Sequence, residues 1–271
     1  MMWGAIIALS ACGYRHGVID MRFIERLATV SLWMFVGLFV QVAHAAQDAQ
    51  LTRMRAALAA PDRPAENKAR DADRKPIESV QFFGIKTGDT VVDMVAAGGW
   101  FTEVLSAAVG PTGKVYSQNP SFLVQADAEK ALLARLGNAE AVHVQLAQAG
   151  LVAKADAVVT AMNLHDVFNG YQDQPGGEAA AVGFLQTLYA ALKPGGVLGV
   201  IDHVGLAGKD NKTLHRMLPQ QARDAITKAG FVIEAESPLL AHAGDDHTKN
   251  VFDPSIRGKT DQFLIRARKP R

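Results

Sequence analysis

Short apolar runs rich in β-branched residues alternate along the chain with segments that have the period of a helix. Five runs predict strands: Thr90–Val95, Lys114–Ser117, Ala141–Leu146, Ala155–Ala161 and Gly196–Asp202. Helical patterns lie between them at Trp100–Val109, Phe122–Leu136 and Glu178–Leu192, and these helices are expected to end at Gly110, Gly137 and Gly195. A further helix at Pro219–Ala229 precedes two strand patterns, FVIEAES and DQFLIRARK. Strands that alternate with helices predict parallel βαβ units covered on both faces.

The segment before these units has a different pattern. Ala46 to Asp73 predicts two short helices, joined by a turn at Pro61–Pro64, that lie outside the main sheet. Pro76 suits the first turn of the next helix, and Gly84 suits its end. We therefore expect a helical segment over residues 46–75 and one α/β domain over residues 76–271.

The first 45 residues have the layout of a secretory signal. Basic Arg22 and Arg26 precede an apolar run, Leu27–Val42, and small residues flank His44 just before Ala46. The run has about 16 residues, whereas a spanning helix needs roughly 20. The prediction is a signal peptide over residues 1–45 that begins at Met21, with residues 1–20 as an upstream extension, cleavage before Ala46 and export to the periplasm.

Two alternatives keep the protein at a membrane. The apolar segment can remain uncleaved as an anchor, or the LSAC stretch ending at Cys12 can be a lipid-attachment site. Cys12 is the only cysteine, so the exported chain would form no disulfide. The formal net charge of +1 and the lack of a basic stripe argue against a nucleic-acid partner and leave a small molecule as the expected one.

The stretch VVDMVAAGGWFTE predicts a strand, a turn and a helix start. Asp93 lies near the end of the strand, and Gly98 and Gly99 let a ligand approach the backbone at the helix start. Gly99 in particular is expected to leave space for that ligand. A dinucleotide site is not indicated, since there is no G-x-G-x-x-G and the second strand ends in Gln118 and Asn119 rather than a carboxylate.

Polar residues also follow the fourth and fifth predicted strands, at the same edge of the sheet. His165 and Asp166 lie in the NLHD stretch, and Asp202 and His203 end the fifth strand. His165 is the candidate general base because histidine titrates near neutral pH; the alternative is a histidine that orders the loop. With His215 these residues are expected to form a histidine-rich pocket, but no spacing is diagnostic of a metal site and none is assigned.

Several longer stretches carry a specific resemblance. They are RKPIESVQFFGIKTGDTVVDMVAAGGWFTEVLSAAVGPTGKVYSQNP, VVTAMNLHDVF, ALKPGGVLGVIDH, TLHR and NVFDPSIRGKTDQFLIRARK. Together they resemble a family of predicted bacterial class I methyltransferases that use S-adenosylmethionine (SAM) and often carry a secretion signal. The resemblance implies a doubly wound, Rossmann-like, mostly parallel seven-stranded sheet whose last strand is antiparallel.

The resemblance also implies a cofactor site. Asp93 and the turn of Val95, Ala97, Gly98 and Gly99 would face the methionine part of SAM, with Asn163 across the crevice. Gln118 and Asn119 would face the ribose. The family pattern at this turn is D-x-G-x-G-x-G, and Val95 and Ala97 replace its first two glycines.

The expected function is therefore SAM-dependent methyl transfer to an acceptor in the cell envelope. The catalytic candidates are His165, Asp166, Asp202 and His203, because methyl transfer needs alignment and, for some acceptors, a base. One alternative is a non-catalytic ligand-binding protein that keeps the fold. A second is a metal-dependent hydrolase.

Overall fold

The structure is a computed structural model that describes residue 41 and residues 44–143, 155–170 and 174–271. The residues from Ala46 to Arg271 form one compact unit, separate from Met1–Ala45. The expected signal segment lies almost entirely outside the described residues, as do residues 144–146 of the third expected strand. Among the residues described, no helix has both the length and the apolar character needed to cross a membrane.

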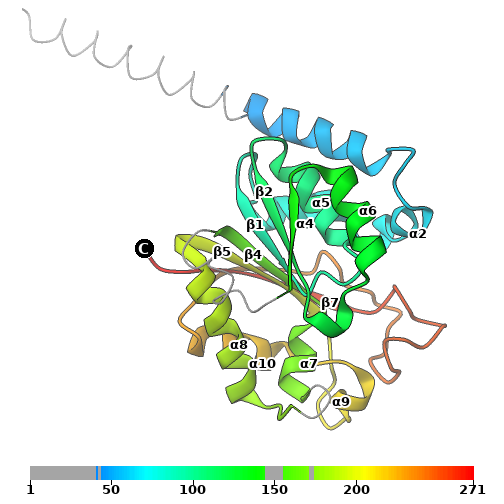
Figure 1. Cartoon of the computed structure of the whole chain (residues 1–271). Helices are drawn as coiled ribbons and strands as arrows, with labels where there is room; N and C mark the ends of the chain where they lie inside the picture. Colours follow the sequence, from blue (N-terminus) through cyan, green and yellow to red (C-terminus); the bar gives the residue numbers. More distant parts are fainter. Residues whose placement is uncertain (1–40, 42–43, 144–154, 171–173) are drawn as a thin grey trace, which may run out of the picture. The chain divides into compact units, whose positions relative to one another are not determined.

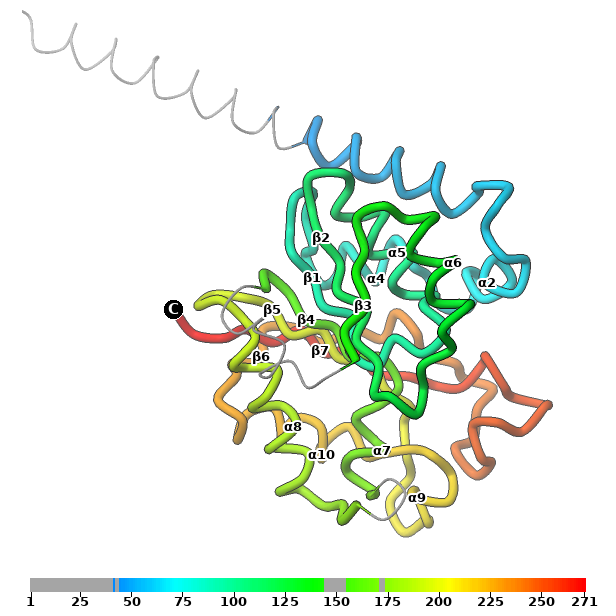
Figure 2. Tube along the Cα trace, viewed as in Figure 1, coloured from blue at the N-terminus to red at the C-terminus, as the bar shows by residue number. Residues whose placement is uncertain are grey.

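The unit from Ala46 onward is built on a seven-stranded sheet (Figures 1 and 2). Its strands are β1 Thr90–Met94, β2 Lys114–Gln118, β3 Ala139–Val142, β4 Ala155–Ala161, β5 Leu192–His203, β6 Val232–Ser237 and β7 Gln262–Arg268. Their order is β3-β2-β1-β4-β5-β7-β6. All neighbours are parallel except the pairs that β7 forms with β5 and β6. This confirms the predicted fold class, including the antiparallel last strand.

Helices cover both faces of the sheet because successive strand residues point to opposite sides. Val91 packs in one core with α4 (Pro76–Phe83) and α5 (Trp100–Val109), whereas Val92 packs in the other with α8 (Glu178–Ala191) and α10 (Pro219–Lys228). Figure 1 shows these helix pairs on opposite sides of the strands. The near-continuous apolar runs of the sequence are thus explained by burial on both faces.

The remaining helices are short or lie at the margins. They are α2 Ala65–Ala69, α3 Asp71–Arg74, the 3-10 turn η2 Ser121–Leu123, α6 Ala126–Leu136, α7 Leu164–Asn169 and α9 Asn211–Leu214, and residues 46–58 are also helical. As predicted, α5 ends at Gly110 and α6 at Gly137. Both glycines have a positive φ, and Gly137 is in the left-handed helical region.

Two predicted boundaries were wrong. The helix expected from Phe122 begins at Ala126, since Phe122 belongs to a separate 3-10 turn. Gly195 does not end a helix: α8 stops at Ala191 and β5 already starts at Leu192. Pro194 is the physical reason, because a proline disfavours helical backbone at the residue before it.

Buried ion pairs hold the segment before the sheet against α5. Arg63 is 3% exposed and donates from Nε to Glu103 Oε2 of α5 at 2.8 Å. Its other nitrogens bond both carboxylate oxygens of Asp71. The indole N–H of Trp100, the first residue of α5, donates to Asn67 and Asp71. These contacts bring α3 beside the turn that follows β1.

Candidate functional site

The carboxyl ends of β1 and β4 form the centre of the candidate site. The chain runs from β1 outward to β2 and β3, and from β4 outward in the other direction, so strand order reverses between β1 and β4. In an open α/β sheet a ligand crevice forms at such a point. Asn163, the residue before α7, donates from Nδ2 to Met94 O at 3.1 Å and to Ala161 O at 2.8 Å. This predicted residue therefore ties the ends of the two strands together.

The turn after β1 keeps a glycine-like backbone without the glycines. Val95 has φ 57° and Ala97 has φ 49°, both in the left-handed region, as is Gly99 at 74°. That region costs an ordinary residue about 1–2 kcal/mol, and a β-branched valine is especially rare there. The two residues that replace the family's glycines thus adopt a conformation that glycines adopt without strain.

Side chains at the end of β2 brace this turn. Val95 N donates to Gln118 Oε1 at 3.2 Å, and Ala97 N donates to Asn119 Oδ1 at 2.7 Å. Asn119 Nδ2 returns a bond to Ala97 O at 3.3 Å. The sequence predicted that both amides face a ribose, but the structure shows them bonded to the strained residues and only 4% and 2% exposed.

Asp93 lies beneath the turn, 2% exposed. Its Oδ2 accepts a bond from Thr102 Oγ1 at 2.6 Å, and that hydroxyl also lies 3.2 Å from Ser117 Oγ. Burial raises the pKa of Asp93 to about 6, although the bonds from Thr102 and the nearby charge of Arg74 oppose the rise. A carboxylate kept at this position despite its burial fits recognition of a cation.

The two glycines of the turn differ in their surroundings. A Cβ at Gly98 would meet no atom within 4 Å, and Gly98 lines a pocket with Ala97, Asn119 and Leu132. A Cβ at Gly99 would lie 2.1 Å from Leu132 Cδ2 of α6, and Gly99 has a positive φ. From the sequence we predicted that Gly99 leaves room for a ligand. Its need for glycine comes instead from α6 and from its own backbone, and Gly98 is the residue that borders open space.

Arg74 belongs to the site although sequence reasoning assigned it no role. It ends α3, and its guanidinium stacks over Trp100 at 4.9 Å from the ring centroid. One nitrogen lies 4.0 Å from Met162 Sδ, just after β4. Burial, reinforced by the charge of Arg70, lowers the pKa of Arg74 to about 10, while Asp71 and Asp93 oppose this. The stretch RKP within the resemblance was the available signal, but the segment was expected to lie away from the sheet.

His165, Asp202 and Asp166 form the second part of the site. His165 is 3% exposed, and its Nδ1 lies 2.6 Å from Asp202 Oδ1. Asp202 is fully buried and also accepts the backbone N–H groups of His165 and His203. On the other side of the ring, His165 Nε2 lies 3.2 Å from Asp166 Oδ1. The ring is therefore held between two carboxylates.

The electrostatics differ from the expectation for a general base. Burial lowers the pKa of His165, but the charges and hydrogen bonds of Asp202 and Asp166 outweigh it and raise the pKa to about 10. The two carboxylates thus favour a positive charge at His165, whereas the sequence led us to expect a histidine that titrates near neutral pH. Two negative neighbours within bonding distance are the physical reason.

The three histidines expected in one pocket do converge. The ring of His165 lies 5.6 Å from that of His203 and 5.8 Å from that of His215. His215, which follows α9, places Nδ1 3.1 Å from Asp166 Oδ1. His203 has a different partner, since its Nδ1 lies 2.8 Å from Thr260 Oγ1. Burial, together with the charges of His165, Arg216 and Arg74, lowers the pKa of His203 to about 3, so it stays neutral.

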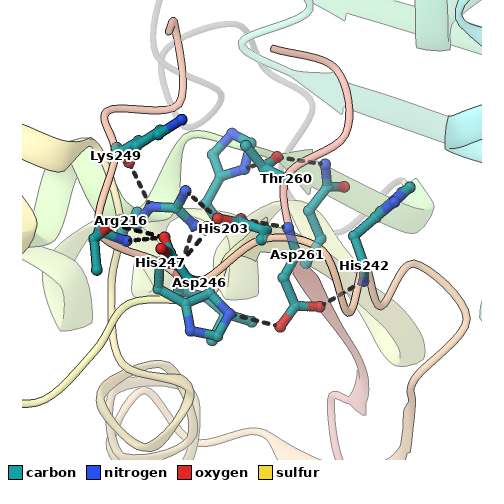
Figure 3. A network of polar contacts seen from close by, with 12 residues as sticks. His203, Arg216, His242, Asp246, His247, Lys249, Thr260 and Asp261 are labelled. Atoms are coloured by element: carbon teal, nitrogen blue, oxygen red, sulfur yellow. Dashed lines mark hydrogen bonds and ion pairs between the residues drawn. The ribbon is translucent and has the colours of Figure 1, made fainter. Parts of the chain in front are cut away.

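A polar network supports the pocket from the segment between β6 and β7 (Figure 3). Arg216 is fully buried and forms two bonds with the carboxylate of Asp245, at 2.8 and 2.9 Å. It also donates to Val204 O and Lys249 O. His247 Nε2 lies 2.9 Å from Asp261 Oδ2 in the same network. Sequence reasoning noted these polar stretches but did not predict that they pair with Arg216 to fix the backbone after His215.

Positive-φ residues mark the same region. Among the described residues, six that are not glycine have a positive φ: Lys75, Val95, Ala97, Met162, His215 and His247. Val95 and Ala97 follow β1, Met162 follows β4, and Lys75 adjoins Arg74. His215 and His247 belong to the segments that form the histidine cluster and its supporting network. Such strained residues gather at functional sites. The strain therefore supports the choice of this crevice.

Comparison with known proteins places the fold. No family model matches the sequence, and no curated protein matches it. A SAM-dependent methyltransferase from Aquifex aeolicus superposes with a TM-score of 0.53 at 22% identity, covering 72% of this chain and 89% of that chain. An arsenic(III) SAM methyltransferase from Chlamydomonas reinhardtii gives 0.51 at 19% identity, covering 81% and 73%. The cyclase SpnF gives 0.52 at 19% identity, covering 73% and 81%.

These structural neighbours share the class I methyltransferase fold. The identities are low, so the likeness concerns the fold and not the activity. One of the three neighbours is described as a cyclase rather than a methyltransferase, which shows that this fold carries more than one chemistry.

Proposed function

We propose that this protein is a SAM-dependent methyltransferase that acts on a small-molecule acceptor in the bacterial cell envelope. The observation that carries the proposal is the turn after β1. Val95 and Ala97 hold the left-handed backbone of a glycine-rich SAM turn, and Gln118 and Asn119 brace it. Such strain persists where the surrounding structure enforces it, and it is typical of ligand sites.

Charge complementarity supports SAM as the ligand. The methionine part of SAM carries an ammonium and a carboxylate. Asp93 offers an anion below the turn, and Arg74 offers a cation close enough to Asp93 to affect its pKa. We assign the ammonium to the Asp93 side and the carboxylate to Arg74. Two solved neighbours are named as SAM-dependent methyltransferases, which agrees with this assignment.

The histidine cluster would form the acceptor side of the crevice. Asp166 is 31% exposed and His165 lies next to it, so these two are assigned to contact with the acceptor. Asp202 and His203 are buried at the end of β5 and act as positioning residues for His165. Methyl transfer from a sulfonium needs mainly alignment of acceptor and methyl group, and a rigid cluster supplies it.

Titration with SAM tests the proposal. We expect binding in the micromolar rather than the nanomolar range, because the ribose side has amides in place of a carboxylate. Gly98→Val should abolish binding with an unchanged melting temperature, since its side chain would fill open space at the turn. Gly183→Val, at an exposed position of α8 where a Cβ also meets nothing within 4 Å, is the matched control. No heat and no melting shift at millimolar SAM would favour the ligand-binding alternative.

A second experiment tests the acceptor side. With an acceptor that supports turnover, His165→Asn should lower the rate by about 10²-fold, the typical cost of lost alignment. SAM affinity should stay unchanged because the side chain of His165 bonds to Asp202 and Asp166 and not to the β1 turn. A structural role predicts another result, in which SAM affinity and melting temperature fall together.

Export is part of the proposal and has its own test. Residues 1–45 read as a signal peptide, and the compact unit that carries the sheet begins at Ala46. We expect N-terminal sequencing of protein from the periplasmic fraction to start at or near Ala46. Met21 retained on membrane-bound protein would indicate an anchor, and a lipid on Cys12 would indicate a lipoprotein.

A further inference from the structure

Three potential metal ligands converge beside the crevice: His165, Asp166 and His215. Their ligand atoms all lie within 4.8 Å of one another. Within the described part of the chain, no other group of three or more His, Cys, Asp or Glu side chains converges in this way. They come from two segments far apart in sequence, α7 and the residue after α9, which the fold places side by side (Figure 2).

Two of the three spacings between these atoms match those of ligands around one ion. His165 Nε2 and His215 Nδ1 lie 3.2 Å and 3.1 Å from the same oxygen, Asp166 Oδ1. Two ligands bound at about 2.1 Å, at angles between tetrahedral and octahedral values, are about 3.0–3.4 Å apart. The two nitrogens lie within 4.8 Å of each other, so His215, whose side chain is 35% exposed, has to move closer to His165 to bind the same ion.

A second shell is already in place for His165. Its Nδ1 lies 2.6 Å from the buried carboxylate of Asp202, which fixes the ring and turns Nε2 toward Asp166. Metal-binding histidines almost always bond through their other ring nitrogen to a carboxylate, a backbone carbonyl or water, which orients the ligand nitrogen. Asp202 is in turn held by the backbone N–H groups of His165 and His203. The cluster therefore has an orienting partner that a surface histidine pair lacks.

The cluster is also accessible. The side chains of Asp166 and His215 are 31% and 35% exposed, so an ion reaches it from solvent and keeps positions free for water or another ligand. Three protein ligands with open positions are typical of catalytic rather than structural metal sites. Two imidazoles and one carboxylate favour a first-row transition ion over Mg²⁺ or Ca²⁺, which prefer oxygen ligands.

We propose that His165, Asp166 and His215 bind one divalent transition-metal ion, with Asp202 as the second-shell partner of His165. The ion site goes beyond the proposed methyl transfer. Only the role of the ion rests on the proposed methyl transfer. In that role the ion would hold an oxygen of the acceptor at the side of the crevice opposite the β1 turn.

Calorimetric titration of the purified, metal-stripped protein with Zn²⁺ tests the site. The expected result is one Zn²⁺ per chain, with Mg²⁺ giving no comparable heat. His215→Ala and Asp166→Asn should each weaken Zn²⁺ binding at least tenfold. The matched control is His143→Ala, because His143 is an exposed histidine paired with a carboxylate, Glu129, outside the cluster. Titration with Co²⁺ should also give visible absorption that His215→Ala removes.

The proposal is overturned if wild type binds Zn²⁺ no more tightly than His215→Ala, or if His143→Ala weakens binding as much. Both cluster variants change partly exposed side chains, so melting curves serve to confirm that they fold. SAM titration of His215→Ala separates this proposal from the previous one. If His215→Ala still binds SAM but no longer binds Zn²⁺, both proposals are supported. If wild type binds Zn²⁺ but not SAM, the metal site stands and the proposed methyl transfer fails.

Discussion

The turn after β1 and the histidine cluster after β4 and β5 lie at the same edge of the sheet but use their polar groups differently. In the turn, the N–H groups of Val95 and Ala97 bond to the amides of Gln118 and Asn119, so the polar groups serve to hold backbone shape. In the cluster, one oxygen of Asp166 lies near two imidazole nitrogens and remains partly exposed. The polar groups of the turn therefore fix a backbone conformation, whereas those of the cluster remain available to bind a ligand.

This difference shows where a sequence motif is a reliable guide. Glycine is one way to obtain a left-handed turn, and a braced turn of ordinary residues is another. Missing glycines therefore do not exclude the backbone that binds a ligand. In the cluster, residue identity itself carries the chemistry, and a substitution there changes what the site can bind.

Asp202→Asn should have the largest effect on stability. Asp202 is fully buried and accepts three N–H groups, two of them from His165. The asparagine side chain would direct its NH₂ group toward N–H groups that need an acceptor. It would also remove the negative charge that lies beside His165. We expect the free energy of unfolding to fall by about 3–5 kcal/mol, measured by urea denaturation. A loss below 1 kcal/mol would show that the cluster is not held by this carboxylate.

Asp93 should make stability depend on pH in the direction opposite to most carboxylates. Burial raises its pKa to about 6 in the folded state, from the ordinary aspartate value of 3.8. The folded state thus holds the proton of Asp93 more tightly than the unfolded state does. The contribution of this group to the free energy of unfolding is fully present below pH 4 and is lost as pH rises through 6. Two pKa units correspond to about 3 kcal/mol.

Asp93→Asn isolates this contribution, since an amide keeps an acceptor for Thr102 Oγ1. The variant should match wild type near pH 4 and exceed it in unfolding free energy at pH 7, by up to about 3 kcal/mol. Denaturation of both proteins between pH 4 and 8 gives the comparison. A constant difference across that range would mean that Asp93 has an ordinary pKa.

Asn119→Ala should weaken the turn by removing both of its bonds to Ala97. The expected loss is about 1–3 kcal/mol in the free energy of unfolding, together with a loss of SAM binding. The double variant with Ala97→Gly should recover binding, because glycine adopts the left-handed backbone without a brace. Failure of the second change to restore any binding would mean that Asn119 contacts the ligand directly, as the sequence predicted.

Much of the fold followed from the sequence because double-sided burial leaves a clear apolar pattern. Residues 155–161 and 100–109 were predicted as the strand and the helix that the structure has. Boundaries were missed where a local rule competed, as at Pro194, where the proline favours extended backbone before it. The apolar pattern does not show where a local backbone preference, such as that imposed by a proline, ends a helix early.

The candidate site was only partly predictable. The convergence of His165 and His203 followed from their places at the ends of strands that meet at one edge of the sheet. His215, which follows α9, was expected to join them, and it does. The pKa of His165 did not, because it depends on the distances to two carboxylates, one of them 37 residues away in sequence. Arg74 was missed because its helix was expected away from the sheet, and ion pairs at Arg63 bring it back.

Ala97→Gly alone should give the smallest effect and the sharpest test of strain in the turn. Relief of the left-handed conformation contributes about 1 kcal/mol or slightly more, and the greater freedom of glycine in the unfolded chain offsets about 0.5–1 kcal/mol. The net change in unfolding free energy should therefore be a few tenths of a kcal/mol, in favour of the variant. Ala59, an exposed residue just after the helical residues 46–58, provides a control position for the same substitution, which should be neutral or destabilising. A clear loss of stability at position 97 would show that the turn stores no strain, and that its shape depends on the alanine methyl group.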